Sequence, residues 1–168
     1  PLSAMARATA VLVTRASQAA RLDDLKAAVR AVAPTVPIWV TDFAPGAVVQ
    51  VGGSSTMEPS ALKGERVLAV SGIGNPASFR KLLEVAGAVV ADYCVFPDHH
   101  AYSREDVQKV RQAAEHLGVD RIVTTEKDAV KLAQFDEVAR QEVPIWALRI
   151  DLTWLEGCDE WTRVVLQG

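Results

Sequence analysis

Three short polar stretches hold the side chains with which this chain could do chemistry. The stretch Asp98–His100 places two of the chain's three histidines beside a carboxylate, and Thr124–Asp128 contains Lys127. The remaining stretch, Gly72–Pro76, is a glycine-rich turn. An imidazole beside a carboxylate suits proton transfer, because its ordinary pKa lies near neutral pH. A lysine ammonium can contact a phosphate. These residue types point to acid–base or phosphate chemistry.

Each polar stretch directly follows a run that predicts a strand: Arg66–Ser71, Ala88–Val95 and Arg121–Val123. The second run has the length and apolarity of a buried strand, and Pro97 ends it because proline offers no ladder donor. If the sheet is parallel, all three stretches lie along one edge, where ligands bind in open α/β sheets. The candidate site residues are then Gly72, Gly74, Asn75, Asp98, His99, His100, Thr125, Lys127 and Asp128.

The glycine-rich turn imitates a dinucleotide-binding fingerprint. Gly72-x-Gly74-x-x-Ala77 follows a predicted strand and precedes a predicted helix, and Asp92 lies about 20 residues on. However, Pro76 stands where a pyrophosphate would need backbone N–H donors. A tight turn that exposes the amides of the helix start to an anion or to a partner domain is the favoured interpretation.

Alternatives stay open for the other two stretches. Asp-His-His is also the signature of manganese-dependent phosphoesterases, but these need an upstream Asp-x-Asp, which does not occur in the chain. For the third stretch, one interpretation has Lys127 contact a phosphate and Asp128 orient it. The other interpretation, equally favoured, is a plain helix start that Thr125 caps, with a solvated lysine.

The surrounding pattern predicts an α/β fold with a mostly parallel sheet sandwiched by helices. Residues 1–45 read as strand, helix and strand, too short a segment to bury both faces of a sheet, and are interpreted as a remnant of a larger α/β domain. Residues 46–63, rich in Gly, Ser and Pro, predict a hinge or linking ribbon. Residues 64–168 then form a carboxyl-terminal α/β domain.

Local signals set the boundaries of several elements in this last domain. Ser103 caps a helix that runs to about Leu117, with Asp106 at the capping-box position. The other predicted elements are a helix from Pro76, a helix from Thr125 through Leu132, and a strand over Pro144–Ile150, with the tail around Trp154 and Trp161 left unplaced.

Composition and charge argue against several classes of protein. A net charge of −3 with scattered Lys and Arg gives no basic face for nucleic acid. No apolar run approaches the ~20 residues that span a bilayer. With 49% hydrophobic and 23% charged residues, the chain fits a soluble protein with an ample core. Cys94 and Cys158 lie far apart in the sequence, which favours two reduced thiols in a cytosolic protein.

Taken together, the three stretches resemble the carboxyl-terminal half of tetraacyldisaccharide 4′-kinases, the lipid A kinases of Gram-negative bacteria. The opening Leu2–Arg15 is similar to that family's stretch just before its hinge, and the resemblance extends to about Ile150. Three linked motifs make it specific. They are Ser-Gly-Ile-Gly-Asn-Pro-x-x-Phe (Ser71–Phe79), Phe-Pro-Asp-His-His (Phe96–His100) and Thr-Thr-Glu-Lys-Asp-Ala-Val-Lys-Leu (Thr124–Leu132).

The resemblance implies a two-domain enzyme. An amino-terminal P-loop domain would bind ATP and Mg²⁺ and dock on the cytoplasmic face of the inner membrane, and a smaller α/β domain would close over the cleft through a ribbon hinge. The γ-phosphoryl group of ATP would pass to the 4′-hydroxyl of an acylated disaccharide lipid, tetraacyldisaccharide 1-phosphate, in lipopolysaccharide biosynthesis. By the same resemblance, His99 would be the base or hydroxyl-orienting group, Asp98 and His100 would support it, and the other candidate residues would line the cleft.

The chain departs from the family's pattern in one respect. Gly-x-x-x-x-Gly-Lys-Ser/Thr does not occur in it, so the phosphate cradle and its Mg²⁺ ligand are absent from these residues. Because the sequence also begins at Pro1 rather than at a methionine, we expect a piece of a longer enzyme that is inactive alone. The alternatives are a non-catalytic binding or regulatory module of the same fold, and a metal-dependent Asp-His-His phosphoesterase.

Overall fold

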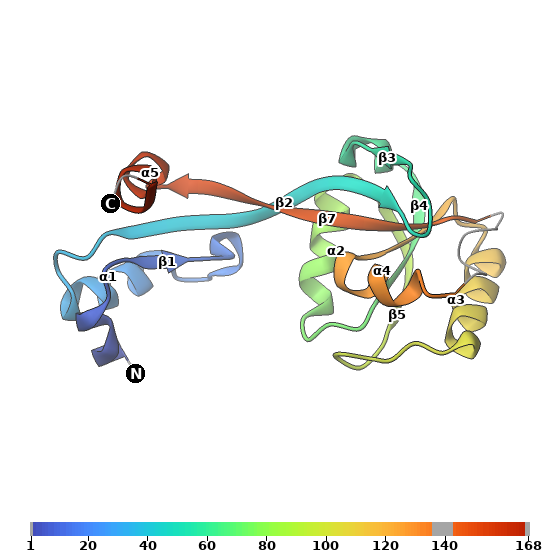
Figure 1. The fold of residues 1–168 in the computed structure, drawn as a ribbon, viewed down its shortest axis with the longest axis horizontal. Coiled ribbons are helices and arrows are strands. Elements are labelled where there is room, and N and C mark those ends of the chain that lie inside the picture. The colour runs from blue at the N-terminus through green and yellow to red at the C-terminus, as the bar shows by residue number, and fades with distance from the viewer. Residues whose placement is uncertain (1, 136–142, 167–168) are drawn as a thin grey trace. The chain divides into compact units, whose positions relative to one another are not determined.

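The computed structural model describes residues 2–135 and 143–166. The chain forms two compact units (Figure 1): unit 1 comprises residues 1–44 and 152–168, and unit 2 comprises residues 45–151. Strands β2 (Ile38–Gln50) and β7 (Ile145–Glu156) are neighbours in the sheet and run in opposite directions. The chain therefore enters unit 2 along β2 and leaves it along β7. The two strands lie close together at Gly46 of β2 and Asp151 of β7. A Cβ atom placed on Gly46 would lie only 2.8 Å from the carboxylate of Asp151.

Unit 1 contains the first strand and helix that the sequence predicts. Strand β1 (Val11–Val13) pairs in parallel with β2, so that Val11 lies opposite Ile38. Helix α1 (Leu22–Val32) buries Val29 completely. The rings of Trp154 in β7 and Trp161 in α5 have centroids 5.3 Å apart. The tail that the sequence left unplaced therefore packs against the end of β7. The other elements of unit 1 are the 3-10 helices η1 (Leu2–Arg7) and η2 (Ala16–Gln18), and α5 (Cys158–Leu166).

Unit 2 holds a sheet whose strands are mostly parallel. Strand β4 (Arg66–Ser71) pairs in parallel with β5 (Val89–Val95) and with β6 (Arg121–Thr125), and β6 pairs in parallel with β7. The strand order is β2-β7-β6-β4-β5, and β3 (Thr56–Met57) pairs antiparallel with β2. The predicted α/β class is confirmed. The helices of this unit are η3 (Pro59–Leu62), α2 (Pro76–Val85), α3 (Arg104–Leu117) and α4 (Glu126–Leu132).

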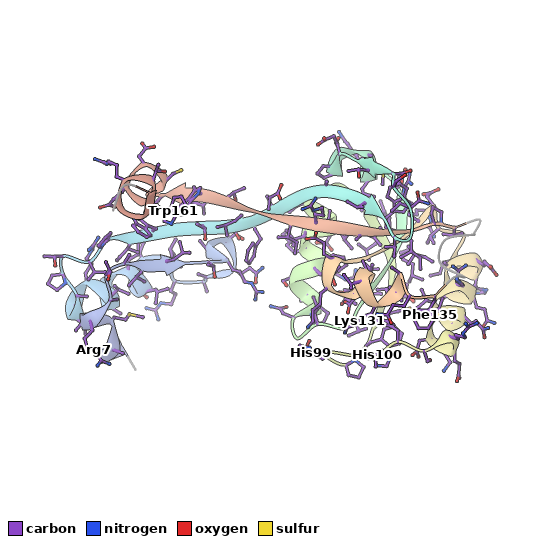
Figure 2. The ribbon with its side chains drawn as sticks, viewed as in Figure 1. Arg7, His99, His100, Lys131, Phe135 and Trp161 are labelled. Atoms are coloured by element: carbon purple, nitrogen blue, oxygen red, sulfur yellow. The ribbon has the colours of Figure 1, made fainter. Side chains whose placement is uncertain are left out.

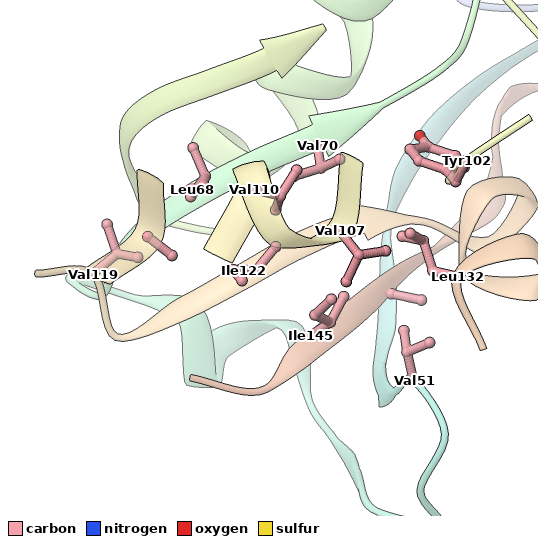
Figure 3. Packing of buried hydrophobic residues seen from close by; sticks show 12 residues of the cluster. Val51, Leu68, Val70, Tyr102, Val107, Val110, Val119, Ile122, Leu132 and Ile145 are labelled. Atoms are coloured by element: carbon pink, nitrogen blue, oxygen red, sulfur yellow. The ribbon is translucent and has the colours of Figure 1, made fainter. Parts of the chain in front are cut away.

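Both faces of this sheet are covered. On β4, Leu68 and Val70 point to one face and pack in a cluster with Val107 of α3 (Figure 3). Val67 and Ala69 alternate with them, so they point to the opposite face, and they are equally buried. The cluster in Figure 3 also includes Val110, Ile122, Leu132 and Ile145.

One strand differs from the prediction. Ala88–Val95 was expected to be a buried strand, and β5 does form there, but it lies at the edge of the sheet with β4 as its one neighbour among the described strands. Val89 and Val95 are 50% and 55% exposed. The apolar composition matches a buried strand. The position of β5 at the edge of the sheet depends on the order in which the strands pair, and the periodicity of the sequence does not predict that order.

The compact units do not coincide with the domain ranges expected from the sequence. Residues 46–63, predicted as a hinge, belong to unit 2 and include the end of β2, the hairpin to β3 and η3. Residues 152–168 group with the start of the chain. The structure thus divides the chain within the paired strands β2 and β7. That residues 1–45 derive from a P-loop domain stays a prediction.

Candidate functional site

The three polar stretches lie at the carboxyl ends of β4, β5 and β6, all in unit 2. We call them the Gly72 loop (residues 72–75, between β4 and α2), the His99 loop (residues 97–100, after β5) and the Lys127 turn (residues 125–128, at the start of α4). Because these strands are parallel, their carboxyl ends share one edge of the sheet. The predicted convergence of the three stretches is confirmed.

Direct hydrogen bonds join the three segments. The amide of Gly72 donates to Oδ2 of Asp128 at 2.9 Å, and the carbonyl of Gly72 accepts from the amide of His99 at 3.2 Å. Nζ of Lys127 donates to Oδ1 of Asp98 at 3.1 Å. This hydrogen bond is the largest cause that lowers the pKa of Asp98 from its ordinary value. The Gly72 loop therefore contacts both neighbouring segments, and the His99 loop is tied to the Lys127 turn.

Glycine at position 72 suits this close packing. A Cβ atom there would lie 3.0 Å from the carbonyl oxygen of Pro97 and 3.2 Å from Cβ of His100. The Gly72 amide is bound to Asp128, and the Ser78 amide in the first turn of α2 donates to Oδ1 of Asn75 at 3.1 Å. The expectation that the turn exposes its amides to an anion is therefore wrong for these two donors, because side chains of the protein occupy them.

The backbone of His99 is in the left-handed region, with φ +60°. A residue other than glycine adopts this conformation at a cost of about 1 kcal/mol, because its Cβ approaches the following carbonyl. The His99 side chain is 77% exposed, and its Nε2 lies 3.8 Å from Oδ2 of Asp98. Its imidazole is thus open to solvent, while its backbone is held.

The neighbouring His100 is held by a hydrogen bond and two ring contacts. Its Nε2 lies 3.0 Å from Oδ2 of Asp106, its ring stacks on Phe96 with centroids 4.7 Å apart, and Tyr102 meets it edge-on at 5.1 Å. Asp106 also accepts a hydrogen bond from the amide of Ser103 at 2.9 Å, which forms the predicted capping box of α3. The hydrogen bond from His100, followed by that from Ser103, lowers the pKa of Asp106 to about 2.

Asp128 lies beneath the site rather than at its surface. It is fully buried, and its Oδ2 also accepts from Oγ1 of Thr125 at 2.8 Å. Thr125 caps α4, as predicted. Oδ1 of Asp128 has no hydrogen-bond partner among the described residues and lies 3.8 Å from Nζ of Lys131. Burial, and then the charge of Asp128, raises the pKa of Tyr102. A cleft-lining position for Asp128 does not agree with this burial.

Sequence reasoning missed Lys131 and the pairing of His100 with Asp106. Nζ of Lys131 donates to the carbonyl of His100 at 2.9 Å, and Figure 2 shows Lys131, His99 and His100 on one side of unit 2. Lys131 follows Asp128 by three residues on a predicted helix, a spacing that brings side chains together, so this signal was present. Asp106 was recognised as a cap, but nothing local indicated that it also binds His100.

Two further observations bear on ligands. Within residues 2–135 and 143–166, no group of three or more His, Cys, Asp or Glu is placed to hold a metal ion. No helix in the same ranges is long and apolar enough to cross a membrane. The amide of Gly72 is already hydrogen-bonded to the carboxylate of Asp128, and the Gly72 loop lacks a P-loop sequence. The residues of this site therefore do not fit the phosphates of ATP or their Mg²⁺.

Comparisons with known proteins agree with one another. The family described as LpxK, tetraacyldisaccharide-1-P 4′-kinase, matches residues 1–167. A tetraacyldisaccharide 4′-kinase of Anaeromyxobacter sp. (strain Fw109-5) is 38% identical over 162 residues, which cover 95% of this chain and 42% of the relative. One of Syntrophus aciditrophicus (strain SB) is 39% identical over 103 residues, covering 61% of this chain and 28% of the relative.

A solved structure shares the fold. The crystal structure of the apo form of LpxK from Aquifex aeolicus in complex with ATP superimposes with a TM-score of 0.62, at 20% sequence identity, and covers 99% of this chain and 44% of that one. The chain therefore spans less than half the length of the relatives it matches.

Proposed function

The chain belongs to the tetraacyldisaccharide-1-P 4′-kinase family, and from that premise we propose that it is the carboxyl-terminal portion of a lipid A kinase. The intact enzyme transfers the γ-phosphoryl group of ATP to the 4′-hydroxyl of tetraacyldisaccharide 1-phosphate in lipopolysaccharide biosynthesis. The family match over residues 1–167 supports this proposal, as does coverage of less than half of each relative.

In this proposal His99 takes the proton from the attacking hydroxyl, or orients that hydroxyl. The observation that carries it is the combination of a 77% exposed imidazole with a backbone held in the left-handed conformation. Backbone strain of this kind is concentrated at functional sites, where the surrounding structure maintains it. A positioned imidazole can accept the proton that a sugar hydroxyl loses as it attacks phosphorus.

The neighbouring residues have supporting roles. The carboxylate of Asp98, 3.8 Å from Nε2 of His99, stabilises the protonated imidazole. Lys127 is 41% exposed and reaches Asp98, so its ammonium can also meet a phosphate of the substrate. His100 supports His99 from a partly buried position. The Gly72 loop, with Gly74 and Asn75, forms the adjoining wall of the cleft, and Thr125 starts the helix that carries Lys127.

ATP and Mg²⁺ bind elsewhere in this scheme. We assign them to a P-loop domain that precedes this chain in the intact protein and docks on the cytoplasmic face of the inner membrane. Unit 2 is then the small domain of such a kinase, and the segment before the hinge is the remnant of the P-loop domain. By itself the chain has no kinase activity, because the phosphate cradle lies outside it. ATP supplies the phosphoryl group, and the residues described above handle the hydroxyl and its proton.

The test begins with the gene. The intact mass of the native gene product and the coding sequence upstream of Pro1 should reveal a Gly-x-x-x-x-Gly-Lys-Ser/Thr segment in the same polypeptide. The full-length protein should then transfer radiolabel from γ-labelled ATP to tetraacyldisaccharide 1-phosphate, whereas residues 1–168 should not. A native product without this segment, or a full-length protein that leaves the lipid unlabelled, would contradict the kinase proposal and favour a non-catalytic binding module.

A further inference from the structure

Asp128 has an unusual environment for a carboxylate. It is fully buried, whereas a charged group in a protein interior is costly unless hydrogen bonds and a counter-charge compensate it. Two donors, the Gly72 amide and the Thr125 hydroxyl, converge on its Oδ2. Its Oδ1 faces Nζ of Lys131 at 3.8 Å. A cap for α4 needs only Thr125, so capping alone does not account for a buried carboxylate at this position.

The hydrogen bonds around Asp128 lead to the His99 loop along two routes. On the first route, Asp128 binds the amide of Gly72, and the carbonyl of Gly72 accepts from the amide of His99. On the second, Lys131 lies beside Asp128 and donates to the carbonyl of His100 at 2.9 Å. The backbone is therefore bound at the amide of His99 and at the carbonyl of His100, on either side of the His99 side chain.

We propose that Asp128 and Lys131 form a brace that positions His99 for its reaction. Neither residue touches the substrate in this scheme, so both are positioning residues. The brace holds His99 in the left-handed conformation, against a cost of about 1 kcal/mol, and so limits the directions in which its exposed imidazole can point. The part that concerns catalysis rests on the proposed kinase function, but the part that concerns loop conformation does not.

The brace differs from the other lysine contact of the same helix. Lys127 reaches a side chain, the exposed carboxylate of Asp98, whose Oδ1 also accepts a hydrogen bond from the His99 amide at 3.0 Å. Lys131 reaches a backbone carbonyl next to His99 and is only 29% exposed. Lys131 therefore restrains the backbone directly, whereas Lys127 acts on it only through the side chain of Asp98.

The variants for the test are Asp128→Asn and Lys131→Met, with Lys131→Arg as the conservative rescue. Asparagine has nearly the shape of aspartate without its charge, and methionine keeps the lysine stem. Arginine keeps both a charge for Asp128 and a donor for His100. Lys109→Met is the matched control, because Lys109 also pairs with an acid on its own helix, Glu105 at 2.9 Å, but lies in the exposed part of α3.

The first measurement is amide hydrogen exchange on residues 1–168. We expect Asp128→Asn and Lys131→Met to accelerate exchange of the Gly72 and His99 amides about 10-fold, while the core amide of Ile122 keeps its rate. Lys131→Arg and Lys109→Met should leave all three rates near those of the unaltered chain. Equal acceleration at Gly72, His99 and Ile122 would show general destabilisation and overturn the brace, as would unchanged rates at Gly72 and His99.

The second measurement uses the full-length protein. Lys131→Met should lower kcat about 10-fold and leave the KM for ATP unchanged, because misplacing a catalytic group slows the chemical step. Lys131→Arg should restore most of kcat. Unchanged kcat in Lys131→Met would overturn the catalytic part of the proposal. A full-length protein without any kinase activity would refute the proposed function instead, and the exchange experiment would still decide whether the brace exists.

Discussion

His99 and His100 are adjacent in the chain, yet their imidazoles are in opposite situations. His100 is fixed by Asp106 and by two aromatic rings, so its position is part of the folded structure. His99 has a fixed backbone and an exposed ring. A group that accepts a proton from a bound substrate must reach that substrate, and of the two histidines His99 has the freedom to do so.

At this scale we predict the effect of removing the His99 imidazole. In the full-length protein, His99→Ala should lower kcat about 10²-fold, as expected when general-base help is lost, and leave the affinity for ATP nearly unchanged. Initial rates and an ATP titration measure the two quantities. His116→Ala is the control, because His116 is the chain's third histidine and lies exposed at the end of α3. Turnover that survives His99→Ala would remove His99 from the mechanism.

Single residues also mark the limit of what the sequence could reveal. Gly72, His99 and Lys127 were identified as one site because each follows a predicted strand, and parallel strands bring their ends together. The burial of Asp128 was not predictable in this way. An acidic residue in the first turn of a helix is normally a solvated, dipole-compensating group, whereas the Gly72 loop closely approaches this one.

Helix α3 shows how an element can be connected to a functional loop. Its capping box, Ser103 with Asp106, fixes the residue at which the helix begins. The same Asp106 oxygen binds His100, so the start of the helix and the His99 loop share one carboxylate. Protonation of that carboxylate would weaken the cap and the loop together.

This sharing predicts an acid-dependent stability. Since folding lowers the pKa of Asp106 from 3.8 to about 2, its contribution to the free energy of unfolding is fully present above pH 3.8 and is lost as the pH falls through about 2. Asp106→Asn should therefore destabilise the chain at pH 5 and lose much of that effect at pH 2. Urea unfolding at several pH values measures this dependence.

Glu105→Gln is the matched control for that measurement. Glu105 is the neighbouring acid in the first turn of α3, but its exposed carboxylate pairs with Lys109 and takes no part in the cap. The difference between Asp106→Asn and the unaltered chain should shrink toward acid pH, whereas that of Glu105→Gln should stay small throughout. A constant effect of Asp106→Asn from pH 5 to pH 2 would refute the assignment.

Elements were predictable from the sequence to different extents. Helices α3 and α4 begin where Ser103 and Thr125 indicated, because a cap is a local interaction within a few residues. Strand β7 continues beyond the predicted Ile150 to Glu156, and β5 lies at an edge. The extension of β7 accompanies its pairing with β2, which is distant in the sequence. Strand β5 lies at an edge because β6 pairs with β4 and not with β5, and local patterns encode neither choice.

For the whole molecule, the main consequence of the proposed function concerns the nucleotide. We predict that residues 1–168 bind no ATP, since they contain no P-loop and the amide of Gly72 is already hydrogen-bonded to Asp128. Calorimetric titration with Mg-ATP should give only heats of dilution. The full-length protein, titrated in the same way, is the positive control. A saturable heat from the chain alone would contradict this prediction and the assignment of ATP to a preceding domain.

The connection between the two units also has a consequence for how the chain is made. Unit 2 is the single uninterrupted segment 45–151, whereas unit 1 needs both ends of the chain. During synthesis, residues 1–44 leave the ribosome before unit 2 does, but they can join residues 152–168 only after unit 2 has been made. Joining these pieces closes a loop as long as unit 2, and the entropy of that closure is smaller once a folded unit 2 holds Gly46 beside Asp151. Unit 2 is therefore expected to fold before the two pieces of unit 1 join.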